Sequence, residues 1–552
     1  MGGYARISSH PTLFQNSIIR KRGGSYNINP GLQSDGLELS VKVTATGEIN
    51  WNFSMKNNKL RILVPLLLPL AFTTGMLLFF SFRYRFELDP DEGINLIKSM
   101  MTLRGYGLYS EVWSDQPPIF NAIMTLWFSL VGMKVNAGRI LVLGFSTMLL
   151  ISAMYYLQKF WGIPHAIFGM IAIATLPFYT SLSVSVMIGL PSISFALLSF
   201  VGIARWHETN NICWLIISAL FLALAVMTKI WTVILVPIFI AGIFINKAGL
   251  FRGKQSLRDS IRPLLAWSLG FILVAVLISL ILIQPIYIPH LVSAHLAAGE
   301  TDVIQSIAEG NPMNSYLDDS LAIFILSIFG MIVVIRSRVW HGLYLAAWTI
   351  SAYLLLLWVI VPFWHHHQIL ITIPAALLGS IAAGSAVADL SRRLRESKIW
   401  DPKFIPSAAI LLVSVFFVYQ RIPPTLRGFN PDLPNLGTYT PEDQPDFEIV
   451  AIINKYADKT NYLFTDRPMY AFRSGIPVHP YLAVFTRKRF ATGQPSQEEI
   501  LSILLETKPE QVILSRFNIP AAQEYMETRN FIRVDSSPRS RHYVKRDIYE
   551  QP

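Results

Sequence analysis

Residues 60–93 read LRILVPLLLPLAFTTGMLLFFSFRYRFELDPDEG, and this stretch decides the fold class. The run from Leu60 to Phe82 is apolar and long enough to cross the hydrocarbon core of a bilayer as a helix. A polar loop follows, which contains Asp89-Pro90-Asp91-Glu92-Gly93. A membrane span with a carboxylate-rich loop at its end predicts a membrane protein with chemistry at the bilayer boundary.

The composition of the whole chain supports the same class. Of its 552 residues, 52% are hydrophobic and only 15% are charged, which excludes an ordinary soluble domain. The single cysteine, Cys213, excludes a disulfide framework and a cysteine-ligated metal site. The net charge is +11, but Lys and Arg of membrane proteins collect in cytoplasmic loops, so we expect no nucleic-acid partner.

Twelve apolar segments are candidate membrane spans. They lie at residues 60–82, 118–133, 139–157, 164–180, 188–204, 212–228, 231–246, 264–286, 319–335, 342–360, 368–388 and 405–420. If all twelve cross the membrane, the basic loops 247–262 and 389–404 fall outside the cell, against the positive-inside rule. If segment 118–133 lies in the interface instead, both loops fall inside. We therefore predict a mainly α polytopic fold with about 11 transmembrane helices.

The eleven-span arrangement also places several polar segments on one side. The loop 83–117, the turn at Lys229, the acidic loop 287–318, the cluster His365-His366-His367 and the C-terminal tail all fall outside. We therefore expect a multi-pass protein of the inner (plasma) membrane. Its site and its C-terminal domain would face the periplasm or the cell exterior.

The chain divides into three parts. Residues 1–54 are polar and without period, which predicts disorder, although Met55 is an alternative start. Residues 55–420 form the membrane domain. Residues 421–552 contain a Pro-rich linker to about residue 445 and a small external α/β domain, with strands near 461–466, 511–515, 531–535 and 542–545. A Ser-x-x-Glu capping box predicts a helix over 496–507.

The first loop holds the candidate catalytic residues, Asp91 and Glu92. Asp89 at the N-cap, Pro90 at the first helical position and Glu92 three residues after the cap match a capping box, which offers Glu92 a structural role. Asp91 is not needed by the cap, so it is the carboxylate freest to act as a general base. Its alternative role is to complement the helix dipole.

Four further groups are candidates for binding substrate. Asp115 and Gln116 precede Pro117-Pro118, where they either begin the interfacial helix or contact substrate. Arg139 and Lys229 lie at span ends, where they either snorkel to the interface or hold an anionic phosphate. His366 and His367 fit contacts to sugar or phosphate, or an aromatic belt. We assign no cofactor, and a divalent metal is the less favoured alternative, because adjacent histidines on a helix point in different directions. His290 and His295 are weaker candidates of the same sort.

The order and common side of these motifs resemble the polytopic C-type glycosyltransferases. The matching residues are Asp91-Glu92, Asp115-Gln116-Pro117-Pro118, Arg139 and Thr228-Lys229, within residues 60–390. The nearest likeness is to the family 39-like group of protein O-mannosyltransferases and lipid A aminoarabinose transferases.

The resemblance implies a transferase that moves a sugar from a polyprenyl-phosphate-linked donor to a hydroxyl group of a lipid, glycan or protein. It implies that Asp91 deprotonates the acceptor in one inverting displacement on the external face. It also implies that Arg139 and Lys229 hold the departing lipid phosphate.

Two features leave alternatives open. Gly93-Ile94-Asn95 and Gln116 stand where mannosyltransferases of this group commonly have His or Phe and a His, so the donor sugar and the acceptor are not assigned. A flippase or transporter of a lipid-linked saccharide is the competing class. It predicts similar halves with broken or charged helices at mid-membrane, and the sequence shows neither. A structural membrane protein with a partner-binding external domain is a third class.

Overall fold

The computed structural model describes most of the chain. The backbone is described for residues 18–22, 25–29, 37–43, 49–55, 58–247, 257–283, 285–310, 313, 317–339, 341–360, 362–396, 404–426, 444–534 and 540–550. The predicted linker therefore lies largely outside the described residues, as do parts of both basic loops. The chain forms two compact units, residues 1–68 and 69–552, which are considered separately below.

The first unit contains an antiparallel sheet of four strands in sequence order. The strands are β1 (Ile18–Arg22), β2 (Ser25–Asn29), β3 (Leu37–Val43) and β4 (Ile49–Met55). Strand β3 reads LELSVKV and β4 reads INWNFSM, so apolar and polar residues alternate with the period of a strand. Apart from Met55, these four strands lie within residues 1–54, for which the sequence predicts disorder. The rest of residues 1–54 lies outside the described part.

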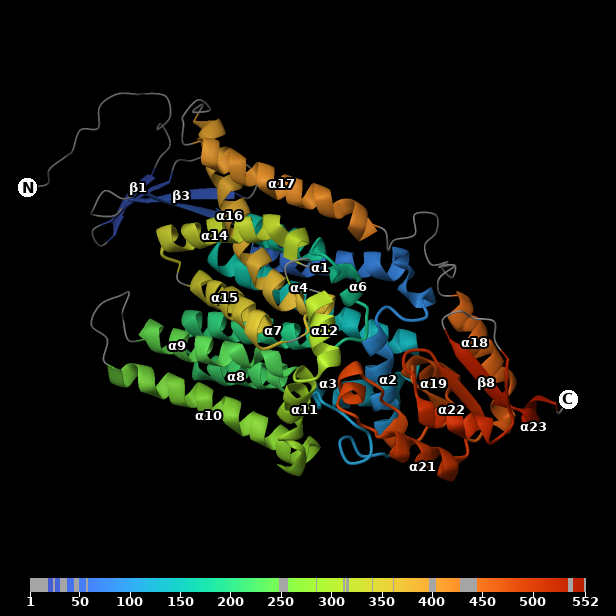
Figure 1. Cartoon of the computed structure of the whole chain (residues 1–552). Helices are drawn as coiled ribbons and strands as arrows, with labels where there is room; N and C mark the ends of the chain where they lie inside the picture. Colours follow the sequence, from blue (N-terminus) through green and yellow to red (C-terminus); the bar gives the residue numbers. More distant parts are fainter. Residues whose placement is uncertain are drawn as a thin grey trace, which may run out of the picture. The chain divides into compact units, whose positions relative to one another are not determined.

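Every apolar segment predicted as a span forms a helix (Figure 1). These helices are α1 (Asn58–Phe79), α3 (Ile119–Val131), α4 (Val135–Phe160), α5 (Ile163–Ala174), α7 (Gly189–Thr209), α8 (Ile212–Val226), α9 (Leu235–Lys247), α10 (Leu257–Leu282), α14 (Leu321–Ser337), α15 (Gly342–Trp358), α16 (Ile369–Arg395) and α17 (Phe404–Leu426). The mainly helical, multi-pass fold class predicted from the sequence is confirmed.

The lengths of these helices bear on which of them cross the membrane. Within the described residues, six helices are long and apolar enough to span: α4, α7, α10, α14, α16 and α17. Helix α3 has 13 residues, or about 20 Å at 1.5 Å per residue, which is shorter than a hydrocarbon core of about 30 Å. Helix α5 has 12 residues and is equally short, so length alone does not single out α3 as interfacial.

Helix α16 lies among its neighbours and is buried along most of its length, whereas α10 is almost entirely exposed. Close crossings depend on glycine. A Cβ atom at Gly330 of α14 would lie 1.9 Å from the Leu378 carbonyl oxygen of α16, and one at Gly202 would lie 2.8 Å from the Ser218 Cβ. Small residues at helix contacts let backbones approach closely, which is how membrane helices gain packing energy.

Short elements connect these helices and carry the polar segments. They are η1 (Ser81–Tyr84), α2 (Pro90–Leu103), α6 (Tyr179–Leu182), η2 (Ile230–Ile234), η3 (Pro285–Tyr287), α11 (His290–Gly299), α12 (Asp302–Gly310), η4 (Asp318–Ser320) and η5 (His365–His367). Helix α2 lies within the loop predicted at 83–117. Helices α11 and α12 lie within the loop predicted at 287–318.

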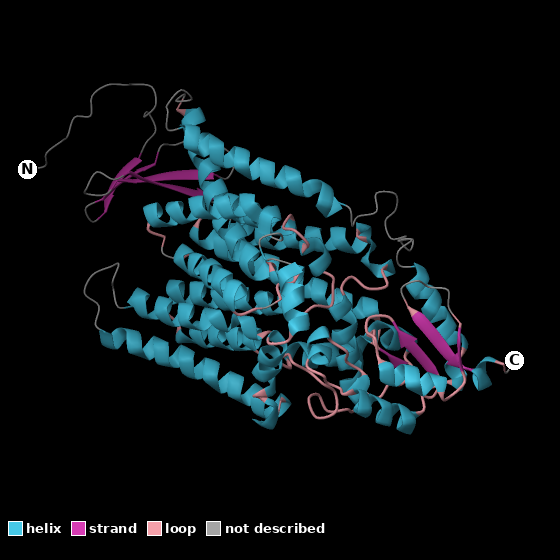
Figure 2. Ribbon diagram, viewed as in Figure 1, coloured by secondary structure: helices cyan, strands magenta, loops and turns pink. Residues whose placement is uncertain are grey.

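The C-terminal residues form a small α/β domain, shown with its sheet in Figure 2. Its sheet order is β5-β6-β8-β7, in which β5 and β6 are parallel and the other pairs antiparallel. Ser496 and Glu499 make the predicted capping box. The elements are α18 (Gln444–Lys455), η6 (Ala457–Lys459), β5 (Leu463–Thr465), α19 (Pro468–Ser474), η7 (Pro480–Leu482), α20 (Arg487–Ala491), α21 (Gln497–Thr507), β6 (Gln511–Leu514), α22 (Pro520–Glu527), β7 (Phe531–Arg533), β8 (Arg541–Lys545) and α23 (Arg546–Tyr549).

This domain packs directly on helix α2. A Cβ atom at Gly93 would lie 2.7 Å from the Met469 nitrogen, so the two helices α2 and α19 meet where the side chain is smallest. Arg473 donates hydrogen bonds to the Arg85 and Phe86 carbonyl oxygens. The C-terminal domain and the loop 83–117 are therefore in contact and lie at the same end of the membrane helices.

Candidate active site

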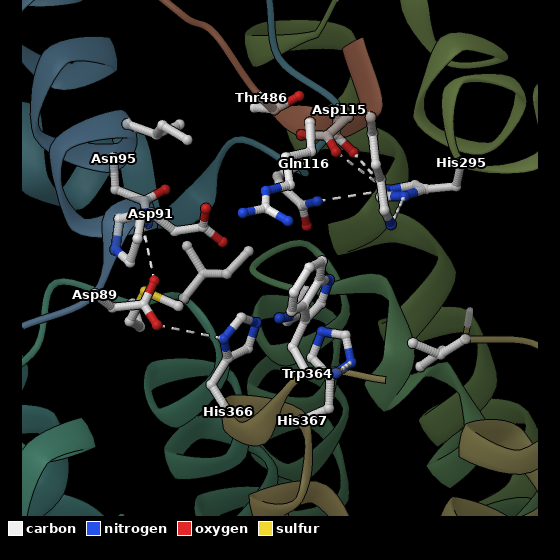
Figure 3. A pocket seen from close by; sticks show the side chains of 18 of the residues that line it. Asp89, Asp91, Asn95, Asp115, Gln116, His295, Trp364, His366, His367 and Thr486 are labelled. Carbon is white, nitrogen blue, oxygen red and sulfur yellow. Dashed lines mark hydrogen bonds and ion pairs between the residues drawn. The ribbon is translucent and has the colours of Figure 1, made fainter. Parts of the chain in front are cut away.

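A cavity of about 900 Å³ lies where helix α2, the membrane helices and the C-terminal domain meet. Figure 3 shows three groups of side chains around this space: Asp89 and Asp91 on one side, Asp115 and His295 on the opposite side, and the neighbouring His366 and His367 between them. Each of the five polar segments predicted to share one side contributes to its lining: Asp91 and Asp115, Lys229, His295, His366, and Lys488.

The N-terminus of α2 fixes the acidic loop. Asp89 is the N-cap, its Oδ1 accepts from the Asp91 nitrogen at 2.9 Å, and Pro90 occupies the first helical position. The predicted reciprocal capping box is not what forms, because the Glu92 carboxylate accepts from the Leu88 nitrogen instead. The remaining Asp89 oxygen, Oδ2, lies 3.3 Å from His365 Nε2 and 3.7 Å from His366 Nδ1. Burial would raise the pKa of Asp89, but these two histidines lower it, so the carboxylate stays ionised.

Asp91 is the acid that faces the cavity. Its carboxylate points into the open space between Asp89 and Asp115 (Figure 3). Among the described residues no donor is hydrogen-bonded to this carboxylate, in contrast to Asp89 and Glu92. Burial raises the pKa of Asp91, and the charge of Asp89 raises it further. A carboxylate with a raised pKa and a free lone pair is suited to take a proton from a bound hydroxyl group.

Asp115 and Gln116 form a second polar wall. Asp115 Oδ1 lies 3.9 Å from Lys98 Nζ, and Asp115 Oδ2 lies 3.6 Å from His295 Nε2. Gln116 Nε2 lies 3.4 Å from the same histidine nitrogen. Burial would raise the pKa of Asp115, but His295 when it is protonated, Lys98 and Lys488 lower it.

Lys229 supplies positive charge to the cavity from the turn between α8 and η2. Its side chain is buried, and Nζ lies 3.4 Å from the centre of the Trp231 ring. No described carboxylate lies within ion-pair distance of Nζ. Burial lowers the pKa of Lys229 to about 7, against the opposing effect of Asp91. A cation with only an aromatic face beside it has donors available for an anionic ligand.

The structure does not bring Arg139 and Glu92 to this cavity. Both side chains are fully buried, and Arg139 donates two parallel hydrogen bonds to the Glu92 carboxylate at 2.8 Å and 2.7 Å. The Arg139 guanidinium also donates to the Phe82 and Arg85 carbonyl oxygens, so its donors are used within the protein. In place of the phosphate-binding and catalytic roles expected from the sequence, we propose that this pair holds α2 against α4.

We expect Arg139→Met to lower the stability of the protein by about 3–5 kcal/mol, because the buried Glu92 carboxylate loses its partner. The measurement is thermal unfolding in detergent. Arg205→Met is the matched control, since the Arg205–Glu208 pair is exposed and is worth at most about 1 kcal/mol. An Arg139→Met variant of unchanged stability that binds donor poorly would contradict the structural role.

Comparisons with known proteins found one matching family model and several similar solved structures. A family model described as dolichyl-phosphate-mannose-protein mannosyltransferase matches residues 115–283. ArnT from Cupriavidus metallidurans in the apo state is similar in structure, with a TM-score of 0.54 and 12% identity over 88% of this chain and 98% of that one. ArnT bound to undecaprenyl phosphate gives a TM-score of 0.53 and 12% identity over 86% and 97%.

The Archaeoglobus fulgidus oligosaccharyltransferase in its apo form gives a TM-score of 0.52 and 11% identity over 83% of this chain and 70% of that one. No curated protein sequence matches this chain at a significant level. The fold is that of a C-type glycosyltransferase. The resemblance seen in the sequence motifs is confirmed by this fold and by the family match.

His366 and His367 both line the cavity. His367 packs edge-on against Trp231, with ring centres 4.3 Å apart. Asp89, His365 and His366 each offer one ligand atom, and these atoms all lie within 4.8 Å of one another. The three side chains could therefore hold a metal ion, because Asp89 reaches the histidines from another element.

Several residues that line the cavity were not predicted from the sequence. Asp91, Asn95 and Lys98 are spaced i, i+4 and i+7, so they share one face of α2, and this pattern would have found Asn95 and Lys98. Arg467, Lys488 and Arg516 come from the C-terminal domain. No local pattern indicates them, because their place in the cavity depends on how the domain packs on α2.

Proposed function

We propose that this protein transfers a sugar from a polyprenyl-phosphate-linked donor to a hydroxyl group of a lipid, glycan or protein acceptor. The observation that carries the proposal is that Asp91, a carboxylate without a described hydrogen-bond donor, shares one cavity with Lys229, a buried lysine without a described carboxylate partner. One group is suited to accept a proton and the other to hold a phosphate.

The reaction follows from this arrangement. Asp91 takes the proton of the acceptor hydroxyl group, and the acceptor oxygen forms a bond to the anomeric carbon of the donor sugar. The bond from that carbon to the phosphate oxygen breaks in the same step, so the sugar inverts its configuration and polyprenyl phosphate leaves. Lys229 stabilises the negative charge that develops on the leaving phosphate. Asp89 holds the backbone of Asp91 in place through its N-cap hydrogen bond.

The comparisons support a lipid-phosphate donor. The matching family model is described by a dolichyl-phosphate-linked sugar, and the similar ArnT structure was solved with undecaprenyl phosphate. The proposal leaves the donor sugar open, hexose or pentose. The apolar residues that line the same cavity, among them Leu291, Leu296 and Val359, offer surface for a polyprenyl chain.

We further propose that the cavity faces the periplasm or the cell exterior of an inner (plasma) membrane. The distribution of Lys and Arg over the loops supports this side. A lipid-linked donor fits it as well, because nucleotide sugars are cytoplasmic and are not available there. A reporter fused to the C-terminus should be accessible from the periplasmic or exterior side of this membrane and not from the cytoplasm. Since the C-terminal domain and the loop 83–117 pack together, a cytoplasmic reporter would move the whole site to the other face.

The pKa of Lys229 predicts how donor capture depends on pH. Below pH about 7 Lys229 is protonated in the free enzyme and can bind the phosphate; above it the charge is lost. We expect kcat/KM for the donor to fall as pH rises through about 7. In Lys229→Arg the cation persists at every working pH, so this basic limb should disappear. A basic limb unchanged in Lys229→Arg would contradict the assignment of Lys229.

The experiment that tests the function supplies the purified protein with a panel of polyprenyl-phosphate sugars and candidate hydroxyl acceptors. We expect one donor to give polyprenyl phosphate and a glycosylated acceptor. A flippase would instead move the intact donor between leaflets and release no polyprenyl phosphate. Turnover of no donor in the panel, together with movement of an intact donor, would favour that alternative.

A further inference from the structure

A chain of three side chains joins the C-terminal domain to the membrane domain at the cavity. Lys488 Nζ of helix α20 lies 2.9 Å from His295 Nδ1 of helix α11. His295 Nε2 lies 3.1 Å from the Asp115 carbonyl oxygen and 3.6 Å from Asp115 Oδ2. Figure 3 shows His295 with Asp115 and Gln116 on the wall opposite Asp89. Helix α20 packs against α11, so the contact belongs to a built interface.

The hydrogen-bond roles in this chain follow from chemistry. A lysine ammonium group only donates, so Nδ1 of His295 accepts, and a carbonyl oxygen only accepts, so Nε2 of His295 carries its hydrogen toward Asp115. The Gln116 amide nitrogen, 3.4 Å from the same Nε2, then donates no hydrogen bond to it. His295 is therefore neutral when the chain is formed. One of the three ammonium hydrogens of Lys488 is used, and within the described residues no carboxylate lies in ion-pair distance of it.

The positive charges in the cavity indicate what kind of ligand Lys488 can bind. Lys488 lines the same cavity as Lys229, and its charge is one of the causes that lower the pKa of Lys229. Burial also lowers the pKa of Lys488 itself. Lys229 and Lys488 thus place two positive charges in one cavity, and among the described residues neither has a carboxylate within ion-pair distance. An anion that binds between them stabilises both charges.

The donor and the product of the proposed reaction differ in the negative charge on the phosphate. A sugar–polyprenyl phosphate is a diester with one negative charge, whereas the released polyprenyl phosphate is a monoester that carries a second. One lysine suffices for the diester. A second lysine stabilises the charge that appears as the carbon–oxygen bond breaks, which is the kind of contact that raises kcat rather than donor affinity.

We propose that Lys488 is a second phosphate-binding residue, supplied by the C-terminal domain, and that His295 is the residue that positions it. This inference rests on the proposed function, and it assigns the C-terminal domain a direct part in the reaction. Deleting the ammonium group of Lys488 removes the second charge contact. Deleting the His295 ring leaves that group present but without its fixed partner.

The test compares wild type, Lys488→Met, Lys488→Arg and His295→Ala. Two quantities are measured in detergent: kcat and KM for the donor, and equilibrium affinity for polyprenyl phosphate and for the intact donor. For Lys488→Met we expect kcat to fall about 10- to 100-fold, with a smaller change in donor KM. Affinity for polyprenyl phosphate should fall about tenfold or more, while donor affinity changes less. Lys488→Arg should retain product affinity, and His295→Ala should lose part of it.

The control is Lys508→Met, an exposed lysine at the C-cap of α21, which should change neither affinity. If Lys488 only docks the domain, Lys488→Met will lower the thermal unfolding midpoint and leave the product-to-donor affinity ratio of the folded protein as in wild type, which would overturn the inference. Should Lys488→Met fail to fold, Lys488→Arg and His295→Ala decide it by the same ratio. Wild-type protein that releases polyprenyl phosphate from no donor would instead refute the proposed function.

Discussion

Asp91→Asn is expected to lower kcat for polyprenyl phosphate release by about 10²- to 10⁴-fold, the range that general-base catalysis contributes. The asparagine amide has nearly the same shape but cannot take the acceptor proton. Donor affinity should change little, because Asp91 faces the acceptor oxygen rather than the phosphate in the proposed geometry. The measurement is kcat and KM with the donor that the panel identifies.

The matched control for this prediction is Asp302→Asn, which neutralises an exposed acid in the first turn of α12. It should leave kcat unchanged. The raised pKa of Asp91 adds a second signature: the acid form is inactive, so kcat/KM should fall as pH falls through a value above that of an ordinary aspartate. Full turnover by Asp91→Asn would remove Asp91 from the mechanism.

Lys229→Met is expected to lower kcat/KM for the donor by about 10²- to 10³-fold, the cost of removing one donor from a site that stabilises developing negative charge. The side chain keeps its volume and its packing against Trp231 but loses its charge. Both donor and product affinity should fall, because Lys229 contacts the phosphate throughout the reaction. The measurement is the kinetics of donor turnover together with binding of polyprenyl phosphate.

Lys134→Met provides the matched control, since Lys134 is an exposed lysine at the start of α4. It tests whether loss of any surface cation near the membrane weakens binding of an anionic lipid. Equal losses in the two variants would show that the attraction is general. Donor affinity of Lys229→Met equal to that of wild type would place the phosphate elsewhere in the cavity.

The features that could be predicted from sequence are those set by local pattern. The twelve apolar segments all form helices because length and hydropathy suffice to specify a helix in a bilayer. The N-cap at Asp89 could be predicted from the Asp-Pro sequence alone. Asp91 was then the candidate base, because the cap does not use its carboxylate. The distribution of basic loops was enough to bring Asp91 and Lys229 to one side.

The features that could not be predicted depend on long-range packing. Arg139 and Glu92 are far apart in the chain, and the sequence predicts both as site residues. Only the folded structure shows that their buried side chains pair with each other. Lys488 stands in the basic run Arg487-Lys488-Arg489, whose members have different surroundings: Lys488 contacts His295, while Arg489 is buried against carbonyl oxygens of its own domain. Sequence alone could not separate them.

The most direct test of the central claim is the stoichiometry of one reaction in proteoliposomes. Wild type and Asp91→Asn are given the active donor with its acceptor, and donor consumed, acceptor glycosylated and polyprenyl phosphate released are counted together. We predict one polyprenyl phosphate released for each sugar transferred by wild type, and a loss of both in Asp91→Asn. Donor that crosses the bilayer intact, at the same rate in both proteins and without polyprenyl phosphate release, would contradict the account.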